Sequence, residues 1–130
     1  MKNPTLADAI YLATKMHEGL HDKTYVPQIL HSLEVMSRLR GDSIEAQIVG
    51  VLHDIVEDTS ITIEYLKREG YSTEIVDAIY ALTRQKSETY MQFIYRAREN
   101  HLARRVKIQD AGHVVEQFES LIKRYRMALD

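Results

Sequence analysis

The sequence predicts an all-α fold, a single compact bundle of about six to eight helices. Apolar residues recur at helical spacing along nearly the whole chain, whereas strand signals such as sustained alternation or an Asn-Gly turn are almost absent. The 130 residues, 45% hydrophobic and 28% charged, are enough to bury one hydrophobic core. We therefore expect residues 1–130 to form one domain without repeats or linkers.

The first three helices follow from apolar spacing and capping residues. Spacing after Pro4-Thr5 predicts a helix over 6–16, and the same spacing predicts a second over 29–39, before Gly41. Ser43 opens a third helix that runs to the His53 segment. Its inward positions are Ile44, Ile48, Val51 and Leu52.

Capping residues also mark the helices of the second half. Thr59 or Ser60 is expected to cap a short helix that ends at Gly70, and Ser72 to cap another that runs through Leu82. A sixth helix is predicted to start at Ser87, near Glu88. The remainder predicts one or two more helices, broken near Gly112.

The segment 53–58, His-Asp-Ile-Val-Glu-Asp, carries the densest group of chemical side chains in an otherwise apolar stretch. Because residues four apart share a helix face, we expect His53 over Glu57 and Asp54 over Asp58. Buried carboxylates cost several kcal/mol unless a cation or a metal pairs with them. The segment therefore points to a metal site.

A metal ion needs ligands from more than one element. His31 interrupts the apolar face of the second predicted helix, and Asp110 follows Val106 and Ile108 further along the chain. Two imidazoles and two carboxylates form a mixed N/O set, which suits manganese, iron or a similar divalent ion better than a thiophilic one. The alternative is that each histidine is an ordinary core or surface residue, as a single histidine on a mixed helix face usually is.

Charge is unevenly distributed along the chain, whose net charge is −2. Residues 1–83 carry 7 basic and 13 acidic side chains, whereas residues 84–107 carry 7 basic and 2 acidic ones, a local charge of +5. A field of that sign beside a pocket would concentrate an anionic ligand such as a phosphate ester. Alternatively, these cations lie on solvated helix faces.

The absence of cysteine excludes thiolate zinc sites, disulfides and cysteine nucleophiles. The sequence has no apolar run of membrane-spanning length and no signal-peptide pattern at its start. We expect a cytoplasmic protein whose partner is a small molecule, with no nucleic acid and no membrane partner. The segment from Tyr125 to Leu129 could serve a homo-oligomer contact as easily as the core.

Together these motifs resemble the HD-domain phosphohydrolases, and among them the (p)ppGpp hydrolase branch, which includes the hydrolase half of the RelA/SpoT enzymes and the small alarmone hydrolases. The resemblance is carried by the string over 51–59, Val-Leu-His-Asp-Ile-Val-Glu-Asp-Thr, with His31 upstream and Lys107-Ile108-Gln109-Asp110 downstream. Weaker matches, which extend the likeness over most of the chain, are His17-Glu18-Gly19, Asp22-Lys23, Pro27 and Leu82-Thr83-Arg84.

The resemblance implies a set of roles for individual residues. One divalent ion, in that family usually Mn²⁺, would be bound by His31, His53, Asp54 and Asp110. Glu57 and Asp58 would be the catalytic pair, acting on the water or the leaving group beside the ion. The candidate substrate-binding residues are Lys23, Tyr90 and Lys107, the lysines for pyrophosphate charge and Tyr90 for stacking. At helical spacing with Phe93, Tyr90 could equally belong to the core.

The departures from the family pattern fall mainly where substrate is read. The family commonly has an Asn four residues after its last Asp and a base-stacking Arg nine residues before its first His. This chain has Val114 and Asp22 at those positions, and it also departs at Leu20, Gln28 and Ser32. Replacing a stacking cation by a carboxylate removes cation–π attraction and repels phosphate.

We therefore expect a metal-dependent phosphohydrolase of a small phosphorylated nucleotide and, more sharply, removal of the 3′-pyrophosphate of (p)ppGpp. From the length of 130 residues we expect no synthetase half. One rival is a phosphatase that acts on a different nucleotide with the same metal centre, which Asp22 and Val114 favour. The other is a non-catalytic helical module that binds metal or nucleotide, against which the intact Glu57 and Asp58 argue.

Overall fold

The computed structural model describes residues 3–110 and 123–124, and within them the chain forms eight α-helices and no strand. The expected all-α class is confirmed. None of these helices is long and apolar enough to cross a membrane. The helices are α1 (Leu6–Met16), α2 (Gln28–Arg38), α3 (Ile44–Leu52), α4 (Ile55–Asp58), α5 (Ile63–Arg68), α6 (Thr73–Ala81), α7 (Tyr90–Glu99) and α8 (His101–Asp110).

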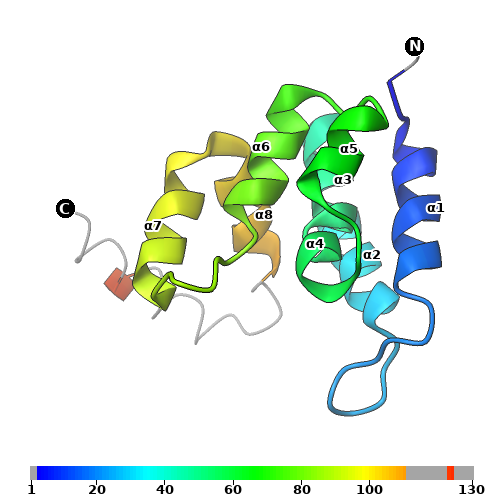
Figure 1. Cartoon of the computed structure of the whole chain (residues 1–130), viewed down its shortest axis with the longest axis horizontal. Coiled ribbons are helices and arrows are strands. Elements are labelled where there is room, and N and C mark those ends of the chain that lie inside the picture. The colour runs from blue at the N-terminus through cyan, green and yellow to red at the C-terminus, as the bar shows by residue number, and fades with distance from the viewer. Residues whose placement is uncertain (1–2, 111–122, 125–130) are drawn as a thin grey trace.

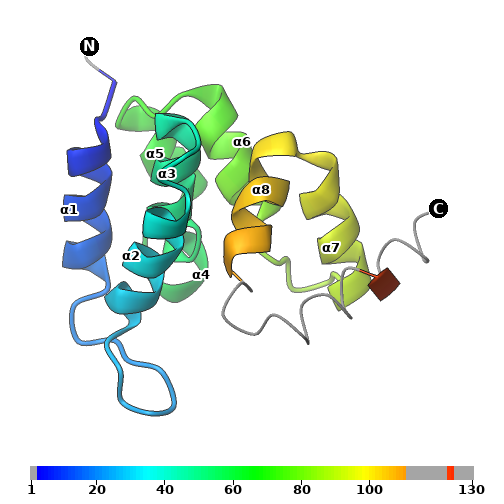
Figure 2. The ribbon, with the colours of Figure 1, turned by 180° about the vertical axis from the view of Figure 1, so that it is seen from behind.

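The central helix of the fold is α3. It packs against α1, α2, α6 and α8, and Figures 1 and 2 show it between α1 on one side and the pair α7 and α8 on the other. A helix surrounded in this way must be apolar on every face, which explains the nearly unbroken apolar run 48–52. Of the four positions of this helix that were predicted to face inward, Ile44 does not: it is 53% exposed at the first turn of α3.

Three of the predicted helix starts are confirmed by side-chain caps. The Thr5, Ser43 and Ser72 hydroxyls each accept a hydrogen bond from the backbone N–H three residues later. At α1 the Asp8 carboxylate also accepts from the Thr5 N–H, so that both parts of a capping box are present.

Two predicted starts are wrong by two or three residues. The cap of α5 is Thr62, because the Thr59 hydroxyl is used at the end of α4, where it donates to the Ile55 carbonyl at 2.6 Å. The cap of α7 is Thr89, with Gln92 completing a capping box. Short polar side chains in a row each satisfy the capping pattern, so that tertiary contacts decide among them.

A close approach between α2 and α3 depends on Gly50. A Cβ atom at this position would lie 2.8 Å from Cδ1 of Leu39 and 3.3 Å from the Met36 Cα, which is backbone of α2. The missing side chain thus lets two helices meet at short range. Because α2 carries His31 and α3 ends beside His53, this contact joins the two elements whose histidine ring centroids lie 5.4 Å apart.

Candidate metal centre

His53 and Asp54 lie at the junction of α3 and α4. The backbone of His53 remains helical, whereas Asp54 departs from it with φ −101° and ψ 0°. The helix through 53–58 is therefore interrupted, although the Asp58 N–H still donates to the Asp54 carbonyl at 2.9 Å. His53 caps the end of α3 and Glu57 lies in α4, so the two residues are not on one continuous helix.

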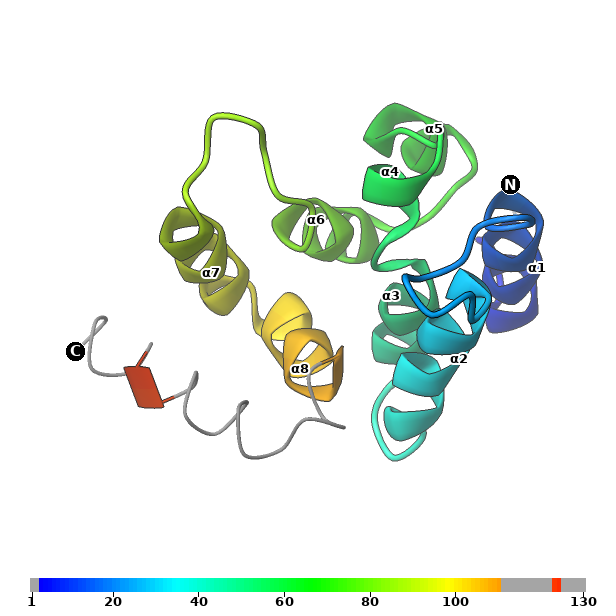
Figure 3. The same cartoon turned by 90° about the horizontal axis from the view of Figure 1, so that it is seen from below.

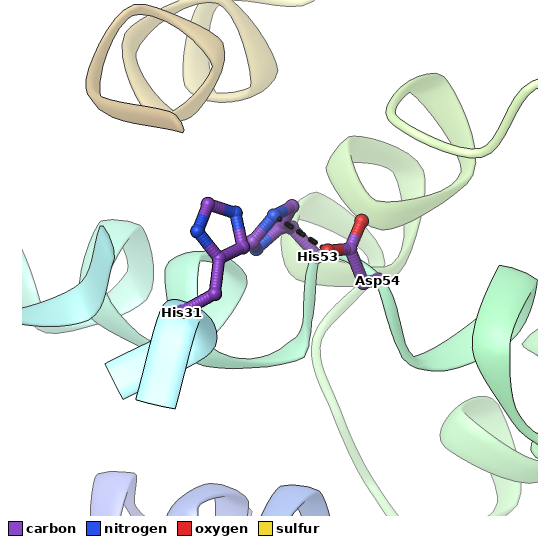
Figure 4. Close-up of side chains that lie close together, drawn as sticks. All are labelled: His31, His53 and Asp54. Carbon is purple, nitrogen blue, oxygen red and sulfur yellow. Dashed lines mark ion pairs between the residues drawn. The ribbon is translucent and has the colours of Figure 1, made fainter. Parts of the chain in front are cut away.

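Three separate parts of the chain bring four side chains together at this junction, which we call the four-residue cluster: His31, His53, Asp54 and Asp110. One donor atom from each of His31, His53 and Asp54 lies within 4.8 Å of the others, and Figure 4 shows the three side chains facing one another. Asp110, at the end of α8, places Oδ1 2.7 Å from His31 Nε2 and 3.4 Å from His53 Nε2. Figure 3 shows α2, α3 and α8 as neighbours when viewed along this end.

The ring of His53 is held so that Nε2 faces the cluster. Nδ1 lies 2.6 Å from the Gly50 carbonyl, which can only accept, so Nδ1 carries a proton and donates it. Nε2 is buried and lacks a hydrogen-bond partner in the described part of the chain, yet Asp54 Oδ2 lies only 3.1 Å away. A histidine fixed at one nitrogen by a backbone carbonyl and open at the other has the usual arrangement of a metal ligand.

The electrostatics of the cluster favour a cation among the carboxylates. Burial opposes the charged form of His53, but Asp54 and Asp110 outweigh it and hold the pKa of His53 well above its ordinary value. Burial alone would likewise raise the pKa of the Asp110 carboxyl. The hydrogen bond with His31, together with the nearby His53 ring, reverses that effect and holds the pKa of Asp110 far below its usual range.

This donor set fits a divalent ion. Two imidazole nitrogens and two carboxylates suit manganese, iron and similar metals. The buried Nε2 of His53, without a hydrogen-bond partner among the described residues, is the atom that most needs an electron-pair acceptor. A divalent ion in this position would also neutralise the two carboxylates, which in its absence draw a proton onto His53.

Two side chains contact the cluster from outside. Gln28 Nε2 lies 3.5 Å from Asp54 Oδ2, and Lys107 Nζ lies 3.3 Å from Asp110 Oδ2. In the sequence Gln28 stands out only as a departure from the family pattern, which does not predict its contact with Asp54. Lys107 was predicted to bind substrate. Its ammonium is instead next to Asp110, and its role in substrate binding stays a prediction.

Glu57 and Asp58, the predicted catalytic pair, have different surroundings. Glu57 Oε1 accepts a hydrogen bond from the Arg84 backbone N–H at 2.6 Å, which ties the end of α4 to the loop between α6 and α7. Asp58 Oδ2 lies 3.5 Å from Nε2 of His17. His17 was missed as a site residue, and the only sequence signal for it was the weak His-x-Gly match.

The other two predicted substrate-binding residues lie on the surface. Lys23 is exposed in the loop that joins α1 to α2. Tyr90 is exposed at the first turn of α7, with the Arg84 guanidinium 5.7 Å from its ring centroid. Tyr90 is therefore not a core residue, and Arg84 joins it through a cation–π contact.

The basic segment 84–107 is only partly available for an anionic ligand. Arg96 donates to the Glu88 carboxylate and to the carbonyls of Tyr80 and Thr83, and Arg105 pairs with Asp42 at 3.4 Å. The local excess of positive charge thus overstates the number of cations that could meet a phosphate.

Of the residues that depart from the family pattern, Asp22 has hydrogen-bond partners in its own loop, whereas the Ser32 hydroxyl has none among the described residues. The Asp22 carboxylate accepts from the backbone N–H groups of Thr24 and Val26, which shapes the loop between α1 and α2. The Thr24 hydroxyl also donates to this carboxylate at 2.8 Å, and its hydrogen bond is the main cause that lowers the pKa of Asp22, with the two backbone bonds adding to it. Ser32 is buried, and its hydroxyl has no hydrogen-bond partner in the described region. Val114 lies outside the described residues, as do Gly112 and the segment from Tyr125 to Leu129.

No protein-family model matches the chain. It is similar in sequence to guanosine-3′,5′-bis(diphosphate) 3′-pyrophosphohydrolase of Haemophilus influenzae, with 40% identity over 83 residues. The match spans 60% of this chain and 12% of the relative's length. It therefore relates this chain to a small part of a much longer protein.

In fold, the chain is similar to a solved structure described as a metazoan ortholog of SpoT that hydrolyses ppGpp and plays a role in starvation responses. The TM-score is 0.67 at 20% sequence identity, and the match covers 85% of this chain and 68% of the other. The expected resemblance to the (p)ppGpp hydrolase branch is thus confirmed by the sequence match, and the helical fold by the structural match.

Proposed function

We propose that this chain is a metal-dependent phosphohydrolase that removes the 3′-pyrophosphate of (p)ppGpp. The observation that carries the proposal is the four-residue cluster, in which donor atoms of His31, His53 and Asp54 lie within 4.8 Å of one another and Asp110 Oδ1 lies 2.7 Å and 3.4 Å from the two histidine Nε2 atoms. The similarity to a ppGpp 3′-pyrophosphohydrolase supports the same reaction class.

His31, His53, Asp54 and Asp110 would hold the ion, for which we propose Mn²⁺. Such an ion, when bound, lowers the pKa of a coordinated water and polarises a phosphoryl oxygen. The Gly50 carbonyl fixes the His53 ring for this task, and Gln28 and Lys107 orient the carboxylates of Asp54 and Asp110.

In the proposed reaction the oxygen of water bonds to the phosphorus attached to the ribose 3′-oxygen, and the bond between that phosphorus and the 3′-oxygen breaks. The attacking water loses a proton and the 3′-oxygen gains one, so the products are pyrophosphate and a nucleotide with a free 3′-hydroxyl. Glu57 and Asp58 follow the cluster by one helical turn and are our candidates for accepting the proton of the water.

We propose Lys23 and Tyr90 as substrate contacts, Lys23 for phosphate charge and Tyr90 for stacking on the base. Both side chains are exposed, as residues that meet an incoming ligand must be. The position at which the family stacks a base is occupied here by Asp22, whose carboxylate is engaged within its own loop. This observation favours a second candidate, a phosphatase with the same metal centre that acts on a different nucleotide.

A substrate panel tests the proposal. The chain is stripped with a chelator, reloaded with Mn²⁺ and incubated with ppGpp, pppGpp and ordinary nucleoside mono-, di- and triphosphates, and the products are resolved by anion-exchange chromatography. We expect pyrophosphate release from ppGpp and pppGpp, and none without metal.

The control variant is His101→Ala, which removes an exposed histidine at the start of α8 and should hydrolyse ppGpp like the wild type. Turnover of another nucleotide but not of ppGpp would select the second candidate. Binding of ppGpp without turnover of any substrate would leave only a non-catalytic binding module.

A further inference from the structure

His17 is a second histidine with a fixed ring orientation. It follows α1 and is 1% exposed. Its Nδ1 lies 2.9 Å from the Ala13 carbonyl, which also accepts the His17 backbone N–H at 3.0 Å. A carbonyl oxygen cannot donate, so Nδ1 carries a proton and Nε2 points the other way.

The Nε2 atom of His17 faces the carboxylate of Asp58. Their separation is 3.5 Å, and no hydrogen-bond partner of Nε2 occurs among the residues that the structure describes. A buried nitrogen lone pair beside a carboxylate would be repelled and unsatisfied. A proton on Nε2 removes that conflict, and the Asp58 carboxylate, together with the more distant Asp54, raises the pKa of His17 accordingly.

We propose that His17 is a positioning residue, whose Nε2–H holds the Asp58 carboxylate, one helical turn after Asp54, so that Asp58 accepts the proton of the attacking water. The inference rests on the proposed function, and it names a role for a side chain that does not itself touch substrate. The Ala13 carbonyl fixes the ring, and the ring in turn fixes the carboxylate.

The contacts of Glu57 support this division of roles. Its carboxylate receives the Arg84 N–H at 2.6 Å and thereby anchors the loop that carries Arg84 toward Tyr90. The Glu57 carboxylate is thus committed to the loop between α6 and α7, whereas the Asp58 carboxylate faces His17. We therefore assign the loop contact to Glu57 and the proton transfer to Asp58.

Two substitutions of His17 separate the proposed role from a purely structural one. In His17→Asn the side-chain amide can replace Nδ1 and keep the bond to Ala13, but nothing reaches Asp58. In His17→Gln the amide replaces Nε2 and can donate to Asp58, but the bond to Ala13 is lost. A structural role predicts that His17→Asn is the milder change, and the proposed role predicts the opposite.

We expect His17→Asn to lower kcat at least ~10-fold with little change in KM, and His17→Gln to retain kcat within ~3-fold of the wild type. Mn²⁺ should raise the melting temperature of both variants as in the wild type, which verifies that they fold and keep the metal site. Equal kcat in the two variants, or a milder loss in His17→Asn, overturns the proposal.

A second measurement does not depend on turnover. Long-range ¹H–¹⁵N spectra of the histidine rings at pH 7, assigned by the signal missing in His17→Gln, should show His17 protonated at both nitrogens, and only at Nδ1 in Asp58→Asn. An unprotonated Nε2 in the wild type overturns the contact. If the wild type hydrolyses nothing, the proposed function and the catalytic part of this inference fail together, while the spectra still decide the His17–Asp58 contact.

Discussion

The four-residue cluster and the surface around it are built in different ways. His53 is 3% exposed and lies at the end of the most buried helix, with a backbone carbonyl fixing its ring. Lys23 and Tyr90, which we propose to meet the substrate, lie instead in a loop and at an exposed first turn. We call these two residues, together with Arg84, the exposed rim.

The metal site and the proposed substrate contacts therefore depend on different parts of this structure. The cluster depends on the packing of α2, α3 and α8, which the core residues determine. The rim depends on loops, whose side chains can change without disturbing the core. Among the positions that depart from the family pattern, Leu20 and Asp22 lie in the loop between α1 and α2, whereas Gln28 and Ser32 lie in α2. None of these four residues belongs to the four-residue cluster.

His53→Ala is the most direct test of the four-residue cluster. Mutating a residue that merely supports a metal ligand typically costs 10- to 100-fold, so we expect losing a ligand to lower kcat/KM by more than ~100-fold. The rise in melting temperature caused by Mn²⁺ should also disappear. Parallel thermal melts and rate assays of His53→Ala and His101→Ala measure both effects. An unchanged Mn²⁺ shift in His53→Ala would remove the metal site.

Tyr90→Ala tests the exposed rim. Stacking of an aromatic side chain on a base is worth about 1–3 kcal/mol, so we expect KM to rise roughly 5- to 160-fold while kcat changes little. The melting temperature should stay within a degree or two, because exposed substitutions usually change stability by less than ~0.5 kcal/mol. Tyr11→Ala, which removes an exposed tyrosine from α1, is the matched control. A large fall in stability would place Tyr90 with the core.

Gly50→Ala tests whether the packing of α2 against α3 controls metal binding at the cluster. The added Cβ would crowd Leu39 and the α2 backbone at Met36, at a typical cost of ~1–3 kcal/mol, against a gain of up to ~1 kcal/mol in helix propensity. We expect a net loss of about 1 kcal/mol in the free energy of unfolding and weaker Mn²⁺ binding, because α2 carries His31. Urea unfolding and metal titration measure the two effects. Unchanged Mn²⁺ affinity would separate the packing of these helices from the site.

The smallest expected effect is a dependence on pH. Because the pKa of His53 is raised in the folded, metal-free chain, this group stabilises the fold fully below its unfolded pKa of about 6.5 and loses that contribution as pH rises through the folded pKa. We expect the melting temperature of chelator-treated protein to fall as the pH rises above about 6.5. The increment from Mn²⁺ should grow over the same range, because protons and metal compete for the ligands. A Mn²⁺ increment that shrinks with pH would contradict this account.

The sequence predicted the fold well where periodicity and caps agreed. The starts of α1, α3 and α6 follow from Thr5, Ser43 and Ser72, each just before an apolar pattern. It failed where several hydroxyl residues stood in a row, as before α5, because each offers the same local hydrogen bond and only the fold chooses. It also predicted a continuous helix where Asp54 breaks one.

For the site, the sequence indicated which side chains would assemble but not what each would contact. His31, His53, Asp54 and Asp110 were expected from the motifs and from the family resemblance that these motifs carry. In the structure, donor atoms of His31, His53 and Asp54 lie within 4.8 Å of one another, and Asp110 contacts both histidines. The pairing of Glu57 with Arg84 N–H, of Asp58 with His17 and of Gln28 with Asp54 joins segments 26 to 41 residues apart. Such contacts depend on how helices and loops pack, and local patterns carry no record of them.

The contact between His31 and Asp110 has a consequence for the rates at which this chain folds and unfolds. It joins residues 79 positions apart, and contacts of such long range close a large loop and tend to form late. An ion shared by these side chains would then be bound by both of them only after α8 has docked. Mn²⁺ should therefore slow unfolding and leave the folding rate nearly unchanged. The ion would then stabilise the folded chain without guiding how it folds.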